Sequence, residues 1–203
     1  MPDPFPIADS FDAILDDIWT RWGRGSADRR SAFHTPVVGT IDANGNPTQR
    51  VMVLRKTDRA TSTLRFHTDQ RSGKAVQVDG HRVSVIGYDA GAKIQVRASG
   101  AAALMTQGDT VDTAWAATSA SGRRSYLTTL PPGSISPLPT SGLPTAIETR
   151  MPLNEETLPG RANFSLLLVT LDRLEWLHLA HDGHRRVAFD RTGDAWQGSW
   201  LVP

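Results

Sequence analysis

Hydrophobic residues recur along this chain in two different periods. Over residues 11–22, large apolar side chains return every three or four positions, which is the period of an amphipathic helix. We therefore expect a helix over residues 10–23, begun by Ser10 as its N-cap and ended by Gly23 and Gly25. Farther along the chain the pattern changes to short apolar runs of strand length, separated by turn residues.

The second pattern predicts a series of short antiparallel strands. Two helices interrupt it, over residues 72–78 and 108–120, and the sequence shows neither βαβ alternation nor an internal repeat. The expected strands are residues 36–41, 50–56, 62–68, 82–89, 93–104, 165–172, 173–179, 185–190 and 195–202. The fold class that follows is mainly β, an antiparallel barrel with helices packed outside it, in a single domain over residues 1–203.

A proline-rich segment interrupts the strand pattern. Residues 131–162 hold seven prolines, several serines and threonines, and few large apolar side chains. Loops of this length without structure are usually functional lids or mobile segments. Because strands resume directly after it, we do not expect a domain linker. We expect this segment to cover or select a substrate, together with Arg123 and Arg124 just before it.

Composition narrows the class of protein. With 39% hydrophobic and 21% charged residues over 203 positions, the chain is typical of a soluble globular protein. A net charge of +1 gives no reason to expect nucleic acid or an anionic membrane as a partner. The absence of cysteine excludes disulfides and thiolate chemistry. Because the N-terminus lacks the basic and apolar regions of a signal peptide, and no apolar run is long enough to cross a bilayer, we expect a cytoplasmic protein.

The histidines do not predict a metal site. His178, His181 and His184 are three residues apart on an expected strand and turn, so their side chains point to differing faces. The sequence also contains no G-x-S-x-G motif, which a nucleophile elbow would require. We therefore expect no bound metal, and the catalytic residues stay unassigned.

An apolar run bracketed by two arginines is the first candidate for binding chemistry. Side chains alternate along a strand, so one face of this run carries Arg50, Met52 and Leu54, and the other carries Val51, Val53 and Arg55. Arginines at strand ends can reach a ligand at the rim of a barrel, and they can equally snorkel as ordinary edge residues. The pattern alone leaves both interpretations open.

A second candidate follows the strand expected over residues 62–68. Arg71, Ser72 and Lys74 open a helix at positions where structural helices favour acidic residues. Basic residues there are mildly destabilising unless an anion is bound. The segment therefore predicts a phosphate site, with Gly73 permitting a close approach between backbone and ligand.

Three later residues offer further binding chemistry. Gln95 presents a donor and an acceptor, which suits the edge of a flavin or a pyrimidine, although a strand glutamine is more often plain surface. Trp176 can form the wall of a site for an aromatic ligand, or it can belong to the core. Arg186 can hold a phosphate or a ring carbonyl.

Taken in order, these pieces resemble the pyridoxamine 5′-phosphate oxidase family, the FMN-binding split barrels. The corresponding segments are residues 50–55 for the family's Arg-x-Val-Leu-Leu-Lys strand, residues 66–68 for its Phe-Tyr-Thr, residues 72–74 for its Ser-Arg-Lys, residues 95–100 for its Gln-Val strand leading to a glycine, Trp176 and residues 184–186 for its Trp and His-x-Arg, and residues 194–203 for its Trp-containing tail ending in proline. The resemblance covers the chain from about residue 36 to its end, except the proline-rich segment.

The resemblance implies an antiparallel split β-barrel with flanking helices, assembled as a homodimer with FMN at the subunit interface. The implied cofactor-binding residues are Arg50, Thr68, Ser72 and Lys74, with help from Arg71, for the phosphate; Val51, Met52, Val53, Leu54, Arg55 and His67 along the flavin; Gln95 at the isoalloxazine edge; and, from the second subunit, Trp176 and Arg186. The flavin ring carries the redox chemistry in such proteins, and the protein orients and tunes it.

The positions that meet substrate in this family depart from its pattern. Where the family has an arginine two residues before the histidine of His-x-Arg, this chain has Asp182, followed by His184. The family's strand-end lysine is Arg55 here, and its second phosphate-binding arginine is Gly73. A carboxylate in place of a substrate-orienting cation argues against a phosphorylated pyridoxine substrate.

The function that the sequence predicts is therefore an FMN-dependent oxidoreductase that acts on a small molecule other than pyridoxamine phosphate. Two alternatives stay open at this point. One is a flavin-binding module without turnover, because the sequence offers no obvious catalytic acid or base. The other is a split-barrel reductase that uses a deazaflavin or a haem-type ligand.

Overall fold

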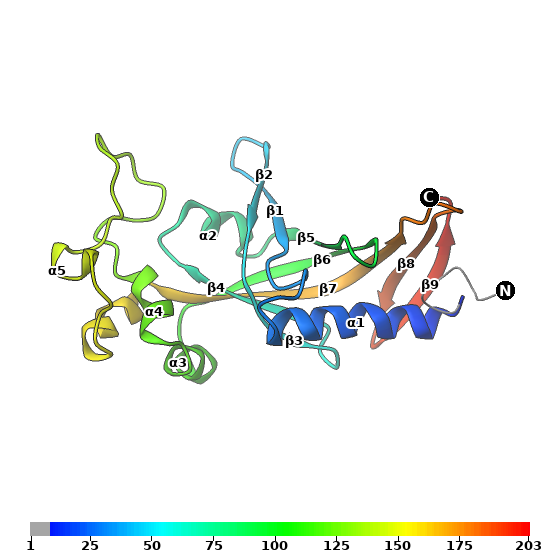
Figure 1. The fold of residues 1–203 in the computed structure, drawn as a ribbon, viewed down its shortest axis with the longest axis horizontal. Helices are drawn as coiled ribbons and strands as arrows, with labels where there is room; N and C mark the ends of the chain where they lie inside the picture. The colour runs from blue at the N-terminus through cyan, green and yellow to red at the C-terminus, as the bar shows by residue number, and fades with distance from the viewer. Residues whose placement is uncertain (1–8) are drawn as a thin grey trace.

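The computed structural model describes residues 9–203, and the first eight residues, where the absence of a signal peptide was inferred, lie outside the described part. The helices are α1 (Phe11–Ala27), α2 (Gly73–Val78), α3 (Asp109–Ala116), α4 (Ala120–Arg123) and α5 (Thr145–Glu148), with 3-10 helices η1 (Arg124–Tyr126) and η2 (Glu155–Ala162). The strands are β1 (Val37–Ile41), β2 (Pro47–Val51), β3 (Leu54–Asp58), β4 (Thr63–Asp69), β5 (Arg82–Asp89), β6 (Ile94–Met105), β7 (Phe164–His178), β8 (Arg185–Thr192) and β9 (Ala195–Leu201). Figure 1 shows α1 running beside the strands, with the proline-rich segment gathered at the opposite end from the two termini.

The strands form one antiparallel sheet in the order β2-β1-β5-β6-β7-β4-β3, with β8 and β9 continuing from β7. The two outermost strands of this order, β2 and β3, follow each other directly in sequence. They do not pair, so the sheet curls without closing. The predicted fold class, mainly antiparallel β with flanking helices, is confirmed.

The strand predicted over residues 50–56 is wrong, because the chain leaves one edge of the sheet and joins the other within it. β2 ends at Val51 and β3 begins at Leu54. Between them, the backbone N–H of Met52 donates to the carbonyl oxygen of Pro36 at 3.0 Å, and that of Leu54 donates to His34 at 2.9 Å. The unbroken apolar run conceals this crossing.

The separate strands predicted over residues 165–172 and 173–179 are one strand of 15 residues, β7. β6 pairs along its length, β4 pairs with its first half, and β8 pairs with its second half. The register shifts between Ser99 and Gly100, where a side chain at Gly100 would lie 1.9 Å from the carbonyl oxygen of Thr170. A glycine is needed at this close approach of the two backbones.

Helix α1 continues past the predicted stop at Gly23 and Gly25 to Ala27. Gly25 is buried, and a Cβ there would lie 2.4 Å from the carbonyl oxygen of Phe33. The glycine therefore serves the close packing of the following loop and does not end the helix. Ser10 is the N-cap, as predicted.

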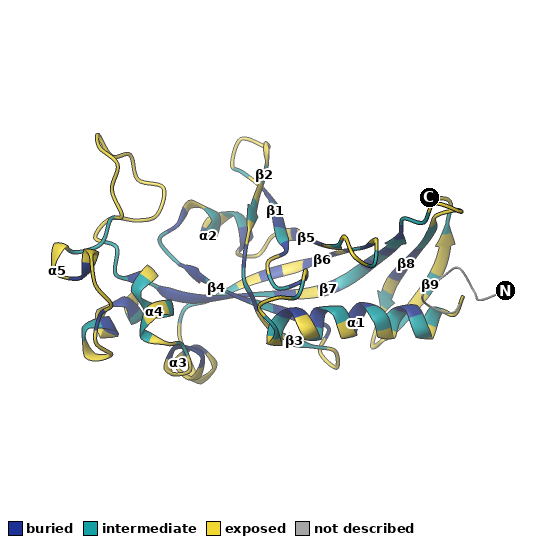
Figure 2. Cartoon of the chain, viewed as in Figure 1, coloured by how far each residue is buried: buried dark blue, intermediate teal, exposed yellow. Residues whose placement is uncertain are grey.

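The helix predicted over residues 108–120 and the proline-rich segment also differ from the prediction. The helix predicted over residues 108–120 ends at Ala116, and a separate turn of helix, α4, follows. The proline-rich segment, predicted as a loop without structure, contains α5 and η2. Figure 2 shows its remaining loops as largely exposed.

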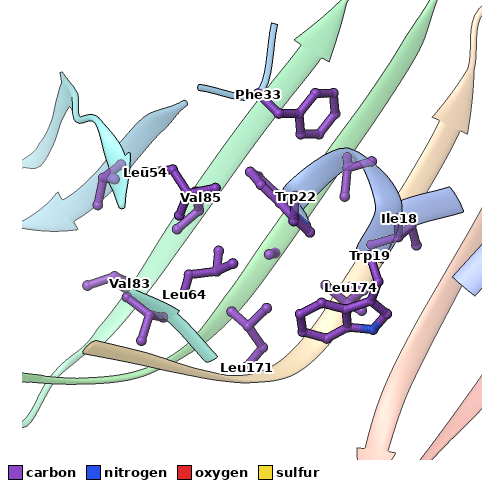
Figure 3. Packing of buried hydrophobic residues seen from close by; sticks show 14 of the residues in the cluster. Ile18, Trp19, Trp22, Phe33, Leu54, Leu64, Val83, Val85, Leu171 and Leu174 are labelled. Carbon is purple, nitrogen blue, oxygen red and sulfur yellow. The ribbon is translucent and has the colours of Figure 1, made fainter. Parts of the chain in front are cut away.

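The core lies between α1 and the inner face of the sheet. Figure 3 shows Ile18 and Trp22 of α1 packed among strand residues such as Leu64, Val85 and Leu174, all of them fully or almost fully buried. A second, smaller apolar cluster holds α3 against the start of β7. Burial of these side chains, at about 25 cal/mol per Å² of apolar surface, fixes the strands that carry the candidate site. Among the described residues, no helix is long and apolar enough to cross a membrane.

Candidate functional site

Arg50, near the end of β2, is held in place entirely by neutral oxygen atoms. Its guanidinium donates to the Oγ1 atoms of Thr40 and Thr48 at 2.6 and 2.9 Å, and to Oε1 of Gln77 at 2.9 Å. It also donates to the carbonyl oxygen of Val38 at 3.4 Å. Burial lowers the pKa of Arg50, and no carboxylate within residues 9–203 pairs with it. The guanidinium is therefore oriented while its charge stays uncompensated.

Lys74, in the first turn of α2, is the second uncompensated cation. Its side chain is half-buried, and burial lowers its pKa. The positive charge of Arg50 lowers the pKa of Lys74 further, while Asp69 acts in the opposite direction. In the described part of the chain no acidic side chain forms an ion pair with Lys74. Holding two cations close together and partly buried is costly unless an anion binds between them.

Thr68 adds an unsatisfied hydroxyl to this region. It is 4% exposed, and its Oγ1 atom has no hydrogen-bond partner among the described residues. Buried hydroxyl groups are almost always paired, so an unpaired one in a native structure indicates a missing partner. Among the predicted phosphate ligands, Arg50 and Lys74 carry charge that no carboxylate of the described chain compensates, and Thr68 carries a hydroxyl without a partner there. We call these three residues the phosphate cluster.

Ser72 and Arg71, also predicted to hold the phosphate, are engaged elsewhere. The hydroxyl of Ser72 donates to the carbonyl oxygen of Asp69 at 2.7 Å. Arg71 forms an ion pair with the same residue's carboxylate at 2.7 Å, and donates to the carbonyl oxygen of Thr128 at 3.0 Å. Arg71 thus ties the end of β4 to the segment before the proline-rich loops. The α2 helix has only six residues, so its dipole adds little.

The other residues predicted along the flavin differ in how far they are buried. Met52 and Leu54 are buried in the core, Val53 is half-buried, and Val51 is 63% exposed. The exposed Val51 therefore lies on the face away from Arg50 and the phosphate cluster.

Arg50 and Gln95 lie on opposite faces of the sheet. Across the ladder, Arg50 is paired with Val38, Val38 with Val85, and Val85 with Ala98. Side chains at paired positions share a face, and Ala98 and Gln95 are three residues apart in β6, which places them on opposite faces. One chain therefore does not bring Gln95 to the phosphate cluster.

Gln95 shares its outer face with Arg186 and not with Trp176. Gln95 is paired with Leu177, which is paired with Arg186. Arg186 forms an ion pair with Glu175 at 2.7 Å. Trp176, the neighbour of Leu177 in β7, points to the inner face. The structure thus places Gln95 and Arg186, two of the three residues predicted around the isoalloxazine ring, on one face of the sheet.

Trp176 lies in the core. It is 1% exposed, and its Nε1 atom donates to Oδ2 of Asp17 at 3.0 Å. Of the two interpretations that the sequence left open for this residue, the structure supports the core one, because the alternation along β7 turns Trp176 inward. We therefore leave Trp176 out of the proposed binding residues.

The predicted substrate residues lie in different parts of the single chain. Asp182 is exposed in the turn between β7 and β8, where His181 contacts it at 2.9 Å. His184 lines a cavity of about 310 Å³ beside Arg186. Arg55 lines a larger cavity, of about 490 Å³, on the far side of β4.

The larger cavity contains residues that the sequence reasoning missed. Arg29 and Arg65 line it together with Arg55 and His67, opposite the segment 114–122. In the sequence, Arg65 and His67 are two residues apart on one predicted strand and have no acidic neighbour there. This spacing could have indicated the β4 side of the cavity. Arg29 follows α1 and could not have been placed from the sequence. Among residues 9–203, no group of acidic or histidine side chains is arranged to hold a metal ion.

With this geometry described, the chain can be compared with known proteins. Residues 17–106, which include the phosphate cluster and Gln95, match the family model for the pyridoxamine 5′-phosphate oxidase FMN-binding domain. The resemblance to the pyridoxamine 5′-phosphate oxidase family is confirmed. No curated protein matches the chain by sequence.

Two solved structures extend the comparison over the whole chain. A pyridoxamine 5′-phosphate oxidase-related, FMN-binding protein from Nostoc punctiforme PCC 73102 superposes with a TM-score of 0.70 at 25% identity, over 98% of this chain and 100% of that chain. PhzG from Burkholderia lata 383, solved in complex with tetrahydrophenazine-1-carboxylic acid, superposes with a TM-score of 0.68 at 16% identity, over 100% of this chain and 97% of that chain. The second likeness concerns the fold alone. The oxidase-like fold thus extends beyond the matched residues 17–106, through β7, β8 and β9.

Proposed function

We propose that this protein binds FMN and acts as an FMN-dependent oxidoreductase on a small substrate. The observation that carries the proposal is the phosphate cluster, in which Arg50 and Lys74 are partly buried without a carboxylate and Thr68 keeps an unpaired hydroxyl. A phosphate monoester offers the two negative charges and the acceptor oxygens that these groups lack. The family match supports a flavin as the rest of the ligand.

The residues fit the cofactor chemically. Arg50 is fixed in orientation by two threonines and Gln77, so it would bind a phosphate oxygen without losing further side-chain freedom. Lys74 would supply a second charge-assisted donor, and Thr68 a neutral one. Bound FMN supplies hydride transfer at its isoalloxazine ring.

The proposal includes a homodimer with FMN at the interface. The dimer is supported by the positions of three residues on the sheet. Gln95 and Arg186 lie on one face, and Arg50 lies on the opposite face. A second copy could present its outer face to the phosphate cluster of the first, and so add an amide and a guanidinium to the same ligand. The amide offers the donor and acceptor that the edge of an isoalloxazine ring requires.

The test begins with the purified protein mixed with FMN and passed through a desalting column. The proposal predicts that flavin absorption elutes with the protein, close to one equivalent per chain, at the mass of a dimer. Lys74→Met is the test variant, and Lys56→Met, an exposed lysine on β3, is the matched control. If the protein retains no flavin, the proposal that it binds FMN is wrong.

Turnover is tested separately from binding. After anaerobic photoreduction, the enzyme proposal predicts that some electron acceptor reoxidises the bound flavin faster than it reoxidises free FMN. Equal rates for bound and free flavin with every acceptor would leave the protein a flavin-binding module without catalysis.

A further inference from the structure

Asp69, the last residue of β4, places a buried negative charge beside the phosphate cluster. Its side chain is 6% exposed, and its carbonyl oxygen accepts hydrogen bonds from the backbone N–H and the hydroxyl of Ser72 at 3.1 and 2.7 Å. This turn leads directly into α2, whose first turn carries Lys74. Burial and the charge of Arg50 lower the pKa of Lys74, whereas the charge of Asp69 raises it. An anion bound at Lys74 would therefore experience repulsion from Asp69 unless this carboxylate is compensated.

Arg71 compensates the carboxylate of Asp69. The Nε and Nη2 atoms of Arg71 donate to the two carboxylate oxygens of Asp69 at 3.1 and 2.7 Å, and the backbone N–H of Arg71 adds a third bond at 2.8 Å. These hydrogen bonds raise the pKa of Arg71. Bidentate pairs of this kind are among the strong interactions of an arginine. Within residues 9–203 no ion pair joins Asp69 to Lys74, so the carboxylate is committed to Arg71.

Thr128 holds Arg71 from the other side. Its carbonyl oxygen and its Oγ1 atom accept hydrogen bonds from the Arg71 guanidinium at 3.0 and 2.9 Å. A guanidinium has five N–H donors, and the bonds to Asp69 and Thr128 use four of them. Arg71 therefore has little capacity left to bind a phosphate itself, although the sequence placed it among the phosphate ligands.

We propose that Arg71 is a positioning residue for phosphate binding, which holds the carboxylate of Asp69 in an ion pair and so keeps it from neutralising Lys74. Without Arg71, a buried carboxylate would be left uncompensated beside Lys74, and an ion pair between these two residues would reduce the cost of burying both charges. The phosphate would then have to compete with Asp69 for Lys74. This inference rests on the proposed function, since it concerns the binding of the FMN phosphate.

The first test is calorimetric titration with FMN and with riboflavin, which lacks the phosphate. In Arg71→Gln the affinity for FMN should fall about tenfold or more, the effect of losing the charged hydrogen bond from Lys74, while riboflavin affinity stays unchanged. Because the loss comes from Asp69, the double variant Arg71→Gln with Asp69→Asn should recover the wild-type affinity for FMN. A direct phosphate ligand at position 71 would give no such recovery.

The second test measures the pKa of Lys74 by NMR in the protein without FMN. This pKa should rise in Arg71→Gln, because the carboxylate of Asp69 then pairs with Lys74. It should stay near the wild-type value in the double variant, which removes one charge of each sign. A residue that only stabilises the fold would not change the pKa of Lys74 in this pattern.

Arg59→Gln is the control for breaking an arginine–aspartate ion pair elsewhere, since Arg59 pairs with Asp16 at 2.6 Å and both side chains are exposed. It should leave FMN affinity unchanged. If Arg71→Gln does not fold, the double variant, which leaves no charge at positions 69 and 71, still decides the question.

Three results would overturn the proposal: a folded double variant that binds FMN about tenfold more weakly than the wild type does, an Arg71→Gln variant with wild-type FMN affinity, or a pKa of Lys74 that does not rise in that variant. If the wild-type protein takes up no FMN but the pKa of Lys74 rises as predicted, the control of Lys74 by Arg71 is supported and the flavin function is wrong.

Discussion

Replacing Lys74 by methionine should weaken FMN binding while leaving riboflavin binding unchanged. Methionine keeps the length and the apolar stem of the side chain but removes its charge. A hydrogen bond to a charged group contributes about 1.5–3 kcal/mol, and a tenfold change in Kd corresponds to about 1.4 kcal/mol. The expected loss of FMN affinity is therefore about 10- to 150-fold. Riboflavin has no phosphate, so its affinity should not respond to this change.

The same variant should have the opposite effect on the apoprotein. Burial and the charge of Arg50 both lower the pKa of Lys74, so the empty site holds Lys74 at a cost. Removing this charge relieves both effects, and the free energy of unfolding without FMN should stay equal or rise.

Calorimetric titration with FMN and with riboflavin, combined with urea unfolding of the apoprotein, measures all three quantities. Lys56→Met provides the control for replacing an exposed lysine outside the phosphate cluster. The reasoning is refuted if Lys74→Met binds FMN as tightly as the wild type does, or if riboflavin affinity falls by the same factor.

Three further predictions concern the framework around the site. Gly100→Ala should destabilise the fold by about 3 kcal/mol in urea unfolding, because the new Cβ would lie 1.9 Å from the carbonyl oxygen of Thr170, and a variant as stable as the wild type would contradict the bulge. Trp176→Phe should lower the free energy of unfolding by about 1–3 kcal/mol, because the hydrogen bond to Asp17 is lost. If this variant instead loses FMN affinity at unchanged stability, Trp176 belongs to the binding site. Because the pKa of His67 is lowered from 6.5 to about 3, the unfolded chain takes up this proton first as the pH falls, so stability decreases between about pH 6.5 and 3 by up to about 1.4 kcal/mol per pH unit. His67→Gln should lack this component when urea unfolding is compared across that range, and parallel pH profiles for the two proteins would be evidence against it.

The local strand and turn pattern could be predicted from the sequence because it depends on neighbouring residues. The strand over residues 82–89 has the predicted limits, and α2 begins directly after Ser72. These elements have alternating or capped patterns that only one local structure satisfies.

Where the sequence predicted the limits of an element incorrectly, contacts with distant residues determine those limits. The division of the apolar run after Val51 depends on hydrogen bonds to Pro36 and His34, and the continuation of α1 through Gly25 depends on the approach of Phe33. Neither partner is signalled within the element itself.

The candidate site was predictable where its residues lie within one or two adjacent segments. Arg50, Thr68 and Lys74 fall within the family's consecutive motifs, and the order of these motifs identified them. The cavity of about 490 Å³ combines Arg29 with Arg65 from distant parts of the chain, so only the fold shows that these two side chains line the same cavity. Alternation alone could not decide which face of β7 is buried, and this is why the position of Trp176 stayed open.

The measurement that tests the central claim most directly is a crystal structure of the protein with bound FMN. The account predicts that the phosphate oxygens lie within hydrogen-bonding distance of Arg50, Lys74 and Thr68, at an interface where a second copy contributes Gln95. A flavin whose phosphate instead lies in the cavity of Arg65 and His67, with the cluster around Arg50 empty, would contradict it.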